Sequence, residues 1–357
     1  MRKYLILILA VMGIATTPPL VQAQHEGHTP EPGTHSQHEG HAPEHGTHSQ
    51  PDEHAPERAM GEHAHMMGKK WMVLYRYMFM DMDGNRDGTR RLNESNVFAK
   101  GFMVAPTLMT MQMHMAGVMY RHSNDLTLMA MLPYRLLSMD HVTMSGVRFT
   151  TQSDGIGDGR LMGRYVLHRW KGQQLRFDAG VSFPTGSTNE KDDMPTGPNQ
   201  KLPYPMQLGS GTFDLLPGIA YMGQTGAWSW GTQLGGTLRL GRNSEGYSLG
   251  EQLAVAVWGT RRWTNWLGTS LRFDGQKEGN IDGQDNDLNP RLVPTADPNR
   301  RARERVDVSL LVDLFGSKGL VQGHRLTAEV RRPIYQFLDG PQLETDWIFA
   351  VAWRLAF

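Results

Sequence analysis

The end of the chain alternates between large apolar residues and small or charged ones. The large apolar residues are Leu343, Trp347, Phe349, Val351, Trp353, Leu355 and Phe357. Between them lie Glu344, Asp346, Ala350, Ala352, Arg354 and Ala356. Because successive side chains of a strand point to opposite faces, residues 343–357 are predicted to form a β-strand with one apolar face and one small or charged face.

A soluble β-sandwich could end on such a strand. The segment nevertheless resembles the C-terminal assembly signal of bacterial outer-membrane β-barrels, which ends on an aromatic residue as this chain ends on Phe357. The resemblance implies insertion by the barrel-assembly machinery, an apolar face in contact with outer-membrane lipid, and Arg354 in the lumen.

The start of the chain is typical of an exported protein. Arg2 and Lys3 precede an apolar run, and Val21-Gln22-Ala23 offers a small-residue cleavage site, so residues 1–23 are predicted to be a signal peptide. The alternative is a membrane anchor, but the run is too short to span about 30 Å of hydrocarbon. The absence of cysteine excludes a lipidated N-terminus, disulfides and thiolate metal sites. Zero net charge gives no indication of a nucleic-acid partner.

Residues 24–69 have a composition unlike the rest of the chain. They hold ten of the fifteen histidines, and residues 25–37 are repeated with small changes at 38–50. Such a segment buries too little apolar area to offset its chain entropy, so it is predicted to be disordered.

Residues 70–357 show a two-residue hydrophobic period interrupted by turn residues. We predict twelve strands, at about 70–82, 104–121, 125–137, 157–170, 173–184, 208–222, 227–241, 249–263, 265–276, 304–315, 322–333 and 343–357. Long connections, most clearly 83–103, 138–156, 185–207 and 277–303, alternate with short ones. This alternation is typical of an all-β, transmembrane, antiparallel up-and-down barrel with long extracellular loops and short periplasmic turns. With an even strand number, residues 24–69 would lie in the periplasm. A large soluble β-sandwich is the alternative.

The polar positions within these strands indicate a charged lumen. In 304–315, for example, Val308 and Leu310 alternate with Asp307 and Asp313, and lipid cannot solvate the charged face. Trp170, Trp263 and Trp266 fall at predicted periplasmic strand ends, as an interfacial aromatic girdle requires.

Three short motifs suggest a family. They are Gly155-Ile156-Gly157-Asp158, the run from Gly180 to Gly186, and the run Leu208-Gly209-Ser210-Gly211-Thr212-Phe213-Asp214. Together they resemble the outer-membrane barrels grouped as the putative MetA-pathway of phenol degradation family, often called simply transporters. The resemblance spans roughly 70–357. It implies a barrel through which small molecules pass, and it supplies no catalytic residues.

Methionine is concentrated in the first strands, where seventeen of the twenty-three methionines lie between Met60 and Met144. The alternation assigns Met72, Met78, Met80, Met82, Met129 and Met131 to the lumen. The methionines of strand 104–121 alternate with Thr110, Gln112 and His114, so we expect that methionine strip to face lipid. Luminal methionine is either packing or a soft ligand for Cu(I) or Ag(I), and Met78, Met80, Met129 and Met131 are the candidate ligands. Copper-resistance protein B is a compositional parallel without a shared motif.

The repeated histidines are the other candidate metal ligands, because imidazole suits Cu(II), Zn(II) and Ni(II). The set comprises His25, His28, His35, His38, His41, His45, His48, His63, His65, Met66 and Met67. The alternative is a polar periplasmic tether in which the histidines are incidental.

One loop matches the spacing of a calcium-binding loop, with Asp83, Asn85, Asp87 and Glu94 as ligands. It joins two strands and carries Arg86, so a polar extracellular loop is the preferred interpretation.

No hydrolase or nucleotide-binding motif is present, so we do not expect an enzyme. The favoured hypothesis is an outer-membrane barrel for binding, export or resistance to transition-metal ions, copper first. The alternatives are a pore for small organic, including aromatic, compounds and a structural or adhesive barrel. Metal passage requires soft or anionic groups along the lumen, whereas an organic solute requires an apolar track.

Overall fold

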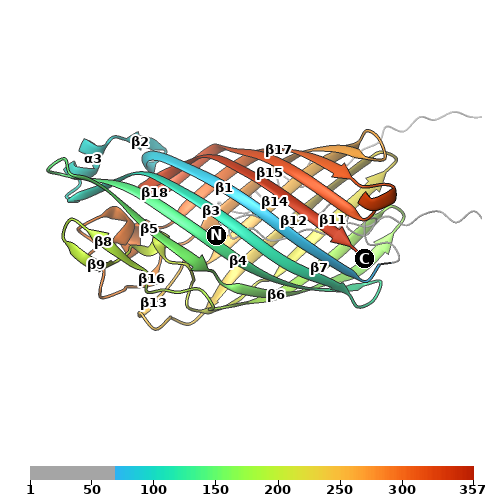
Figure 1. The fold of residues 1–357 in the computed structure, drawn as a ribbon, viewed down its shortest axis with the longest axis horizontal. Coiled ribbons are helices and arrows are strands. Elements are labelled where there is room, and N and C mark those ends of the chain that lie inside the picture. The colour runs from blue at the N-terminus through green and yellow to red at the C-terminus, as the bar shows by residue number, and fades with distance from the viewer. Residues whose placement is uncertain (1–68) are drawn as a thin grey trace, which may run out of the picture. The chain divides into compact units, whose positions relative to one another are not determined.

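A closed antiparallel β-barrel accounts for most of the chain that the structure describes. The computed structural model describes residues 69–357. Eleven strand elements pair in a ring, and the ring closes where β18 pairs with β1 (Figure 1). They are β1 (Trp71–Gly88), β3 (Val104–Arg121), β4 (Leu126–Thr143), β6 (Gly159–Trp170), β7 (Gln173–Phe183), β11 (Gly218–Thr225), β12 (Trp228–Leu240), β14 (Gln252–Arg262), β15 (Leu267–Glu278), β17 (Arg303–Phe315) and β18 (His324–Ala356).

The last element, β18, crosses the barrel wall twice. Residues 325–338 pair with β17, residues 338–356 pair with β1, and both pairings are antiparallel. A closed ring of antiparallel neighbours needs an even number of segments, so the chain must reverse within β18. The Ala356 amide donates to the Gly323 carbonyl at 3.0 Å, which joins the two ends of this hairpin. The wall therefore has twelve segments, and the predicted twelve-strand up-and-down barrel is confirmed.

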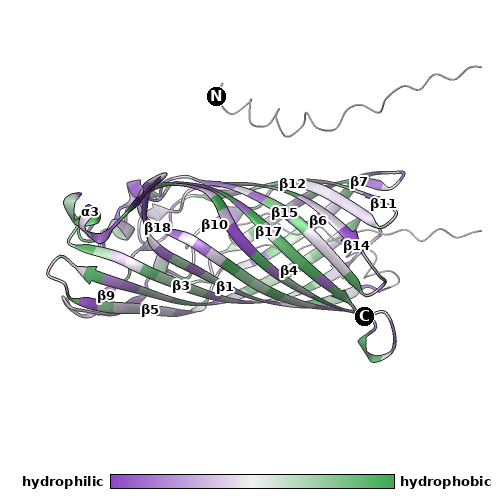
Figure 2. Ribbon diagram, turned by 90° about the horizontal axis from the view of Figure 1, so that it is seen from above, coloured by the Kyte–Doolittle hydropathy of each residue, from purple (hydrophilic) through white to green (hydrophobic). Residues whose placement is uncertain are grey.

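The outer surface of the barrel is apolar. Along the second half of β18, Trp347, Phe349 and Val351 are exposed, whereas Ala350 and Arg354 are buried inside. Figure 2 shows the same alternation as green bands along the other wall strands. An apolar outer band around a polar interior is the arrangement that lipid requires of a spanning barrel. Trp170, Trp263 and Trp266 lie exposed near strand ends, as predicted.

In residues 69–357, no helix combines the length and apolar character needed to span a membrane.

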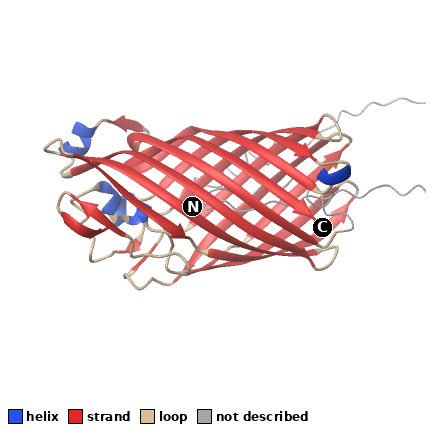
Figure 3. Cartoon of the chain, in the orientation of Figure 1, coloured by secondary structure: helices blue, strands red, loops and turns tan. Residues whose placement is uncertain are grey.

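The two ends of the barrel differ. The turn end holds the short connections, the start of β1 and Phe357, with one 3-10 helix, η4 (Gly319–Val321). The loop end holds the other short helices (Figure 3). The loop-end elements are β2 (Arg90–Leu92), α3 (Glu94–Ala99), β5 (Arg148–Ile156), β8 (Lys191–Met194), β9 (Gly197–Lys201), η1 (Tyr204–Met206), β10 (Phe213–Leu215), β13 (Tyr247–Ser248), β16 (Asp282–Gly283), η2 (Pro294–Ala296) and η3 (Pro298–Arg300).

Some of the predicted boundaries are wrong. The connection predicted at 138–156 is a hairpin, because β4 continues to Thr143 and β5 pairs back along it. The strand predicted at 208–222 is interrupted. β10 ends at Leu215, and β11 begins only after Pro217, a residue that has no amide to donate to a ladder.

The seam that closes the barrel joins the first and last residues of the wall. The Trp71 amide donates to the Phe357 carbonyl at 3.1 Å, and the Phe357 amide returns a bond to the Trp71 carbonyl at 2.9 Å. On the inner face of this seam, Met72 lies opposite Ala356 and Met78 lies opposite Ala350. Large methionines on β1 therefore meet small alanines on β18.

Candidate functional site

One side of the lumen is lined by methionine. We define the methionine wall as the inward-facing methionines of β1, β3 and β4: Met72, Met78, Met80, Met82, Met109, Met111, Met113, Met115, Met119, Met129, Met131 and Met139. These residues belong to one continuous apolar cluster. Strand pairing aligns many of them in rungs across the wall.

Two rungs hold methionine on all three strands. Near the turn end, Met72 of β1 lies opposite Met119 of β3, which lies opposite Met129 of β4. Near the loop end, Met82, Met109 and Met139 are aligned in the same way. Side chains directly opposite on an antiparallel pair lie about 5 Å apart at Cβ, so each rung brings its thioethers together.

The prediction that the methionines of β3 face lipid is wrong. They are buried in the lumen, and it is Gln112 and His114 that lie on the outer face. These polar groups are satisfied there by tyrosines of β1. The Tyr77 hydroxyl donates to Gln112 Oε1 at 3.0 Å, and the Tyr75 hydroxyl lies 2.7 Å from His114 Nδ1. The polarity of the side chains alone therefore predicted the wrong inner face for this strand.

The rest of the lumen is lined by paired charges. Arg176 and Asp178, Arg272 and Asp274, Arg305 and Asp307, and Arg325 and Asp313 form buried ion pairs with distances of 2.7–3.0 Å. Buried charges are tolerated when they are paired. The lumen therefore has an apolar, polarisable side and a charged side.

A loop between β7 and β10 enters the lumen at the loop end. Leu202, Met206 and Leu208 are buried in the same cluster as the methionine wall. The Ser153 hydroxyl on β5 donates to the Met206 carbonyl at 2.6 Å. This loop therefore narrows the lumen beside the methionines.

Asp158 holds that loop in place. Its carboxylate accepts the amides of Gly186 at 3.0 Å and Ser210 at 2.7 Å. The Thr185 hydroxyl also donates to the Gly157 carbonyl at 2.7 Å. The three motifs that suggested a family thus meet at one point of the fold.

The other loops cover the same end. Tyr204 packs edge-on against Tyr247, and the Lys201 ammonium lies 3.0 Å from both Glu245 and Asp285. Burial opposes the charge on Lys201, but the hydrogen bonds and negative charges of these two acids outweigh burial and raise its pKa. Glu245, Asp285 and Asp287 are the one acidic group in residues 69–357 close enough to share a cation, and the Lys201 ammonium already lies against two of them.

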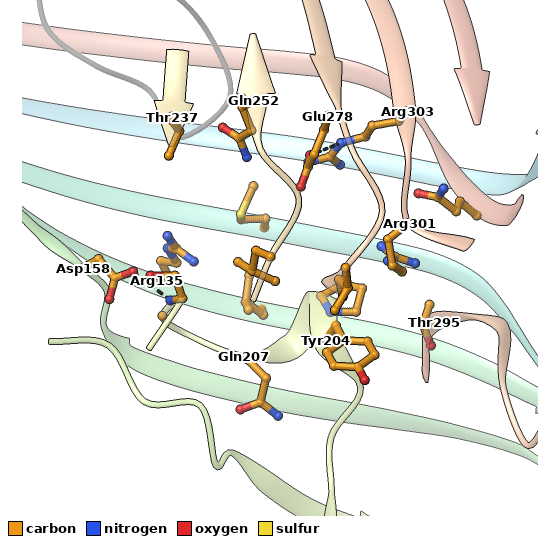
Figure 4. Close-up of a pocket in the computed structure, with 18 of the residues that line it drawn as sticks. Arg135, Asp158, Tyr204, Gln207, Thr237, Gln252, Glu278, Thr295, Arg301 and Arg303 are labelled. Carbon is orange, nitrogen blue, oxygen red and sulfur yellow. Dashed lines mark hydrogen bonds and ion pairs between the residues drawn. The ribbon is translucent and has the colours of Figure 1, made fainter. Parts of the chain in front are cut away.

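A cavity of about 150 Å³ lies under this cover (Figure 4). Met80, Met82, Met109, Met111 and Met139 line one side. Six arginines and three acids also line it, so positive charge is in excess: Arg135, Arg160, Arg239, Arg301, Arg303, Arg305, Asp158, Asp214 and Glu278.

Arg301 differs from Arg239 and Arg303, which also line the cavity and form ion pairs. Arg239 pairs with Asp214 and Arg303 pairs with Glu278, both at 2.6 Å. The Nη1 nitrogen of Arg301 is buried and has no hydrogen-bond partner among residues 69–357. Burial, together with the nearby charge of Arg303, lowers the pKa of Arg301 to about 10, so the guanidinium remains charged at neutral pH.

The candidate metal ligands from the sequence lie partly in the barrel wall and partly outside the described residues. Met78, Met80, Met129 and Met131 are buried on the lumen side, as the alternation predicted. His25, His28, His35, His38, His41, His45, His48, His63, His65, Met66 and Met67 lie outside the described residues, and metal binding by them stays a prediction.

The residues that match the calcium-loop spacing make separate contacts. Asp87 pairs with Lys100 at 2.6 Å, and Glu94 pairs with Arg148 at 3.6 Å. Asn85 is buried and donates to the Pro106 carbonyl at 2.6 Å. The segment through Gly88 is strand rather than a free loop.

Sequence reasoning missed Arg301 as a luminal residue and gave Asp158 no role. Asp158 belongs to the motif Gly155-Ile156-Gly157-Asp158. Its position directly after a glycine could have indicated a close contact with backbone amides. Arg301 stands in an arginine-rich run before β17, where no periodicity reveals the direction of a side chain.

Comparisons with solved structures agree on the barrel. An outer-membrane channel from Pseudomonas putida F1 is 12% identical, with 81% of this chain and 96% of that chain covered and a TM-score of 0.58. Two other structures have lower TM-scores. A FadL homologue from Pseudomonas aeruginosa is 10% identical, with 81% of this chain and 90% of that chain covered and a TM-score of 0.42. The β domain of the Bordetella autotransporter BrkA is 12% identical, with 81% of this chain and 100% of that chain covered and a TM-score of 0.44. No protein-family model matches the chain. No curated protein matches it either. The likeness to the Pseudomonas putida channel shows the fold that the two chains share.

Proposed function

We propose that this protein is an outer-membrane channel for small organic solutes. The observation that carries the proposal is the luminal cavity, in which a methionine surface faces an excess of arginine. The barrel fold and its apolar outer band are consistent with a membrane channel. The motif resemblance to the phenol-degradation barrels implies a barrel through which small molecules pass.

The cavity fits a solute with an aromatic part and an anionic group. Thioethers make favourable contacts with aromatic rings, worth about 0.3–1.5 kcal/mol each. Guanidinium groups bind carboxylates with paired hydrogen bonds. Arg301 offers a buried Nη1 nitrogen that has no hydrogen-bond partner among residues 69–357.

Planar-bilayer recordings on the purified full-length protein would test the proposal. Benzoate should reduce the current reversibly at lower concentration than acetate or benzyl alcohol. Only benzoate has both an aromatic ring and a carboxylate. Arg301→Met should weaken the benzoate effect about tenfold, and Arg301→Lys should restore part of it. Arg291→Met is the matched control, since Arg291 is exposed outside the cavity. Equal effects of benzoate and acetate, or no effect of Arg301→Met, would overturn the proposal.

Transition-metal handling, copper first, is the second candidate. The His-rich segment supports it, as does the lumen position of the methionines of β3, which the sequence alone had assigned to lipid. Removal of residues 24–69 should lower copper tolerance while leaving barrel levels unchanged. Unchanged tolerance of both this truncation and a full deletion would exclude this candidate.

A further inference from the structure

We propose that Met72, Met119 and Met129 form a binding site for a soft monovalent metal ion, Cu(I) or Ag(I), on the lumen wall. The three residues form the rung nearest the turn end, and their exposed fractions are 0%, 0% and 3%. Met162 of β6 lies opposite Met129 and is available as a fourth donor. This inference concerns metal binding by the barrel and does not depend on which solute the channel passes.

The spacing of the strands suits the coordination. Neighbouring strands lie about 4.8 Å apart, and directly opposite side chains are closer than diagonal ones. Methionine has three rotatable bonds before its terminal methyl, so sulfurs from three adjacent strands can turn toward one ion between them.

The ligand type selects the ion. Neutral thioethers are soft donors that favour Cu(I) and Ag(I) over hard cations such as Ca²⁺ and Mg²⁺. A thioether carries no proton that must be lost before it binds a metal, so binding should persist at acidic pH.

The immediate neighbours of this rung on β1 and across the seam are small or apolar. The neighbouring inward positions on β1 and β3 are Leu74 and Gly117, and Ala356 lies opposite Met72 across the seam. A Cβ at Gly117 would lie 3.0 Å from both Leu74 Cδ1 and Met131 Cγ, so these two side chains pack over the glycine next to the rung. Basic residues flank it on three strands: Arg160 and Arg164 beside Met162 on β6, Arg121 after Met119 on β3, and Arg354 opposite Leu74 on β18.

The other methionine triad is less suited to a cation. Met82, Met109 and Met139 line the cavity together with six arginines. Met82 is only half-buried, and Thr151 rather than a fourth methionine lies opposite Met139. We therefore place the ion at the turn-end rung.

Packing alone does not account for methionine at every position of the rung. Burying a methionine costs more side-chain entropy than burying a leucine of similar volume. Leucine would fill this wall at lower cost, as Leu74 does next to the rung.

Silver binding to the purified full-length protein at pH 5 tests the site. At this pH most histidines of the N-terminal segment are protonated, since the unperturbed pKa of imidazole is about 6.5. The triple variant Met72→Leu, Met119→Leu, Met129→Leu should bind one Ag(I) fewer than the wild type. Met103→Leu combined with Met144→Leu, at two exposed loop methionines, should bind as the wild type does.

A second measurement does not depend on folding of the triple variant. In wild-type protein labelled with ¹³C at the methionine methyls, Ag(I) should shift the resonances of Met72, Met119 and Met129, each assigned from its own single Met→Leu variant. Equal Ag(I) stoichiometry and affinity in the wild type and a folded triple variant would overturn the proposal, as would shifts confined to other methionines. The benzoate experiment uses a different site, so its outcome is independent of this one.

Discussion

The carboxylate of Asp158 accepts the Ser210 amide at 2.7 Å, across fifty-two residues of sequence. The same carboxylate accepts the Gly186 amide, so one side chain at the start of β6 holds both ends of the inward loop. A hydrogen bond to a charged group contributes about 1.5–3 kcal/mol. The position of the loop in the lumen therefore depends strongly on this residue.

Asp158→Ala should release the loop and raise single-channel conductance, and Asp158→Asn should have a smaller effect because one acceptor oxygen remains. Bilayer recordings would measure both. Asp83→Ala, at an exposed carboxylate of the same end, is the control and should change neither conductance nor noise. Equal conductance of the alanine variant and the wild type would mean that other contacts suffice to hold the loop.

Gly209→Ala should destabilise the barrel by about 1–3 kcal/mol, the usual cost of forcing extra atoms into a packed site. A Cβ at this position would lie 2.4 Å from the Gly186 carbonyl oxygen and 2.6 Å from Asp158 Oδ1. Gly259→Ala is the matched control, because a Cβ there would have no neighbour within 4 Å. Denaturant unfolding in detergent would compare the two, and equal midpoints would contradict the expected clash.

Deletion of Phe357 should impair assembly more than Phe357→Ala. The deletion removes both backbone bonds to Trp71, whereas the substitution removes only apolar contact with lipid. The amount of heat-modifiable barrel in outer-membrane fractions measures the difference. Leu320→Ala, at a fully exposed turn residue, should assemble normally. Wild-type amounts of the deletion variant would show that the seam closes without its last residue.

Single cysteines would establish the orientation of the barrel, since the native chain has none. Asp193→Cys and Asn286→Cys, both exposed at the loop end, should react with an impermeant maleimide on intact cells. Asn124→Cys, exposed at the turn end, should react only after permeabilisation. Asn85 is unsuitable as a labelling position because it is buried. The reverse labelling pattern would place the loops in the periplasm.

A peptide of residues 24–69 should bind several Cu(II) or Zn(II) ions at pH 7.5 and lose most of them by pH 5. Protonation of imidazole near pH 6.5 removes the donor lone pair. Isothermal titration at the two pH values would measure this loss. A peptide with its histidines replaced by asparagine is the control, and equal binding by the two peptides would show that the carboxylates hold the metal.

Much of the wall could be predicted because side-chain period and strand face are local properties. The outward direction of Trp347 and the inward direction of Arg354 follow from their positions in one strand. The two-residue hydrophobic period also predicted twelve wall segments, which the hairpin in β18 completes.

The face of β3 could not be decided from polarity, since both of its faces carry adaptable residues. One sequence feature did indicate the correct face. Gln112 and His114 share a face with Val118 and Tyr120, and an apolar and an aromatic residue at the end of the strand are suited to contact lipid. The contact that holds the inward loop was beyond prediction, as it joins segments that no local pattern relates. The same holds for Arg301, whose direction is set by the loops packed around it.

The alanines of β18 that face the methionines of β1 leave the inner side of the seam to the methionine side chains. Ala350 and Ala356 reduce the last strand to little more than backbone on its inner side, next to the longest flexible side chains of the wall. Substitutions at these alanines would therefore change the width of the lumen beside the seam in small steps. They would leave the methionine thioethers and the buried charges unchanged.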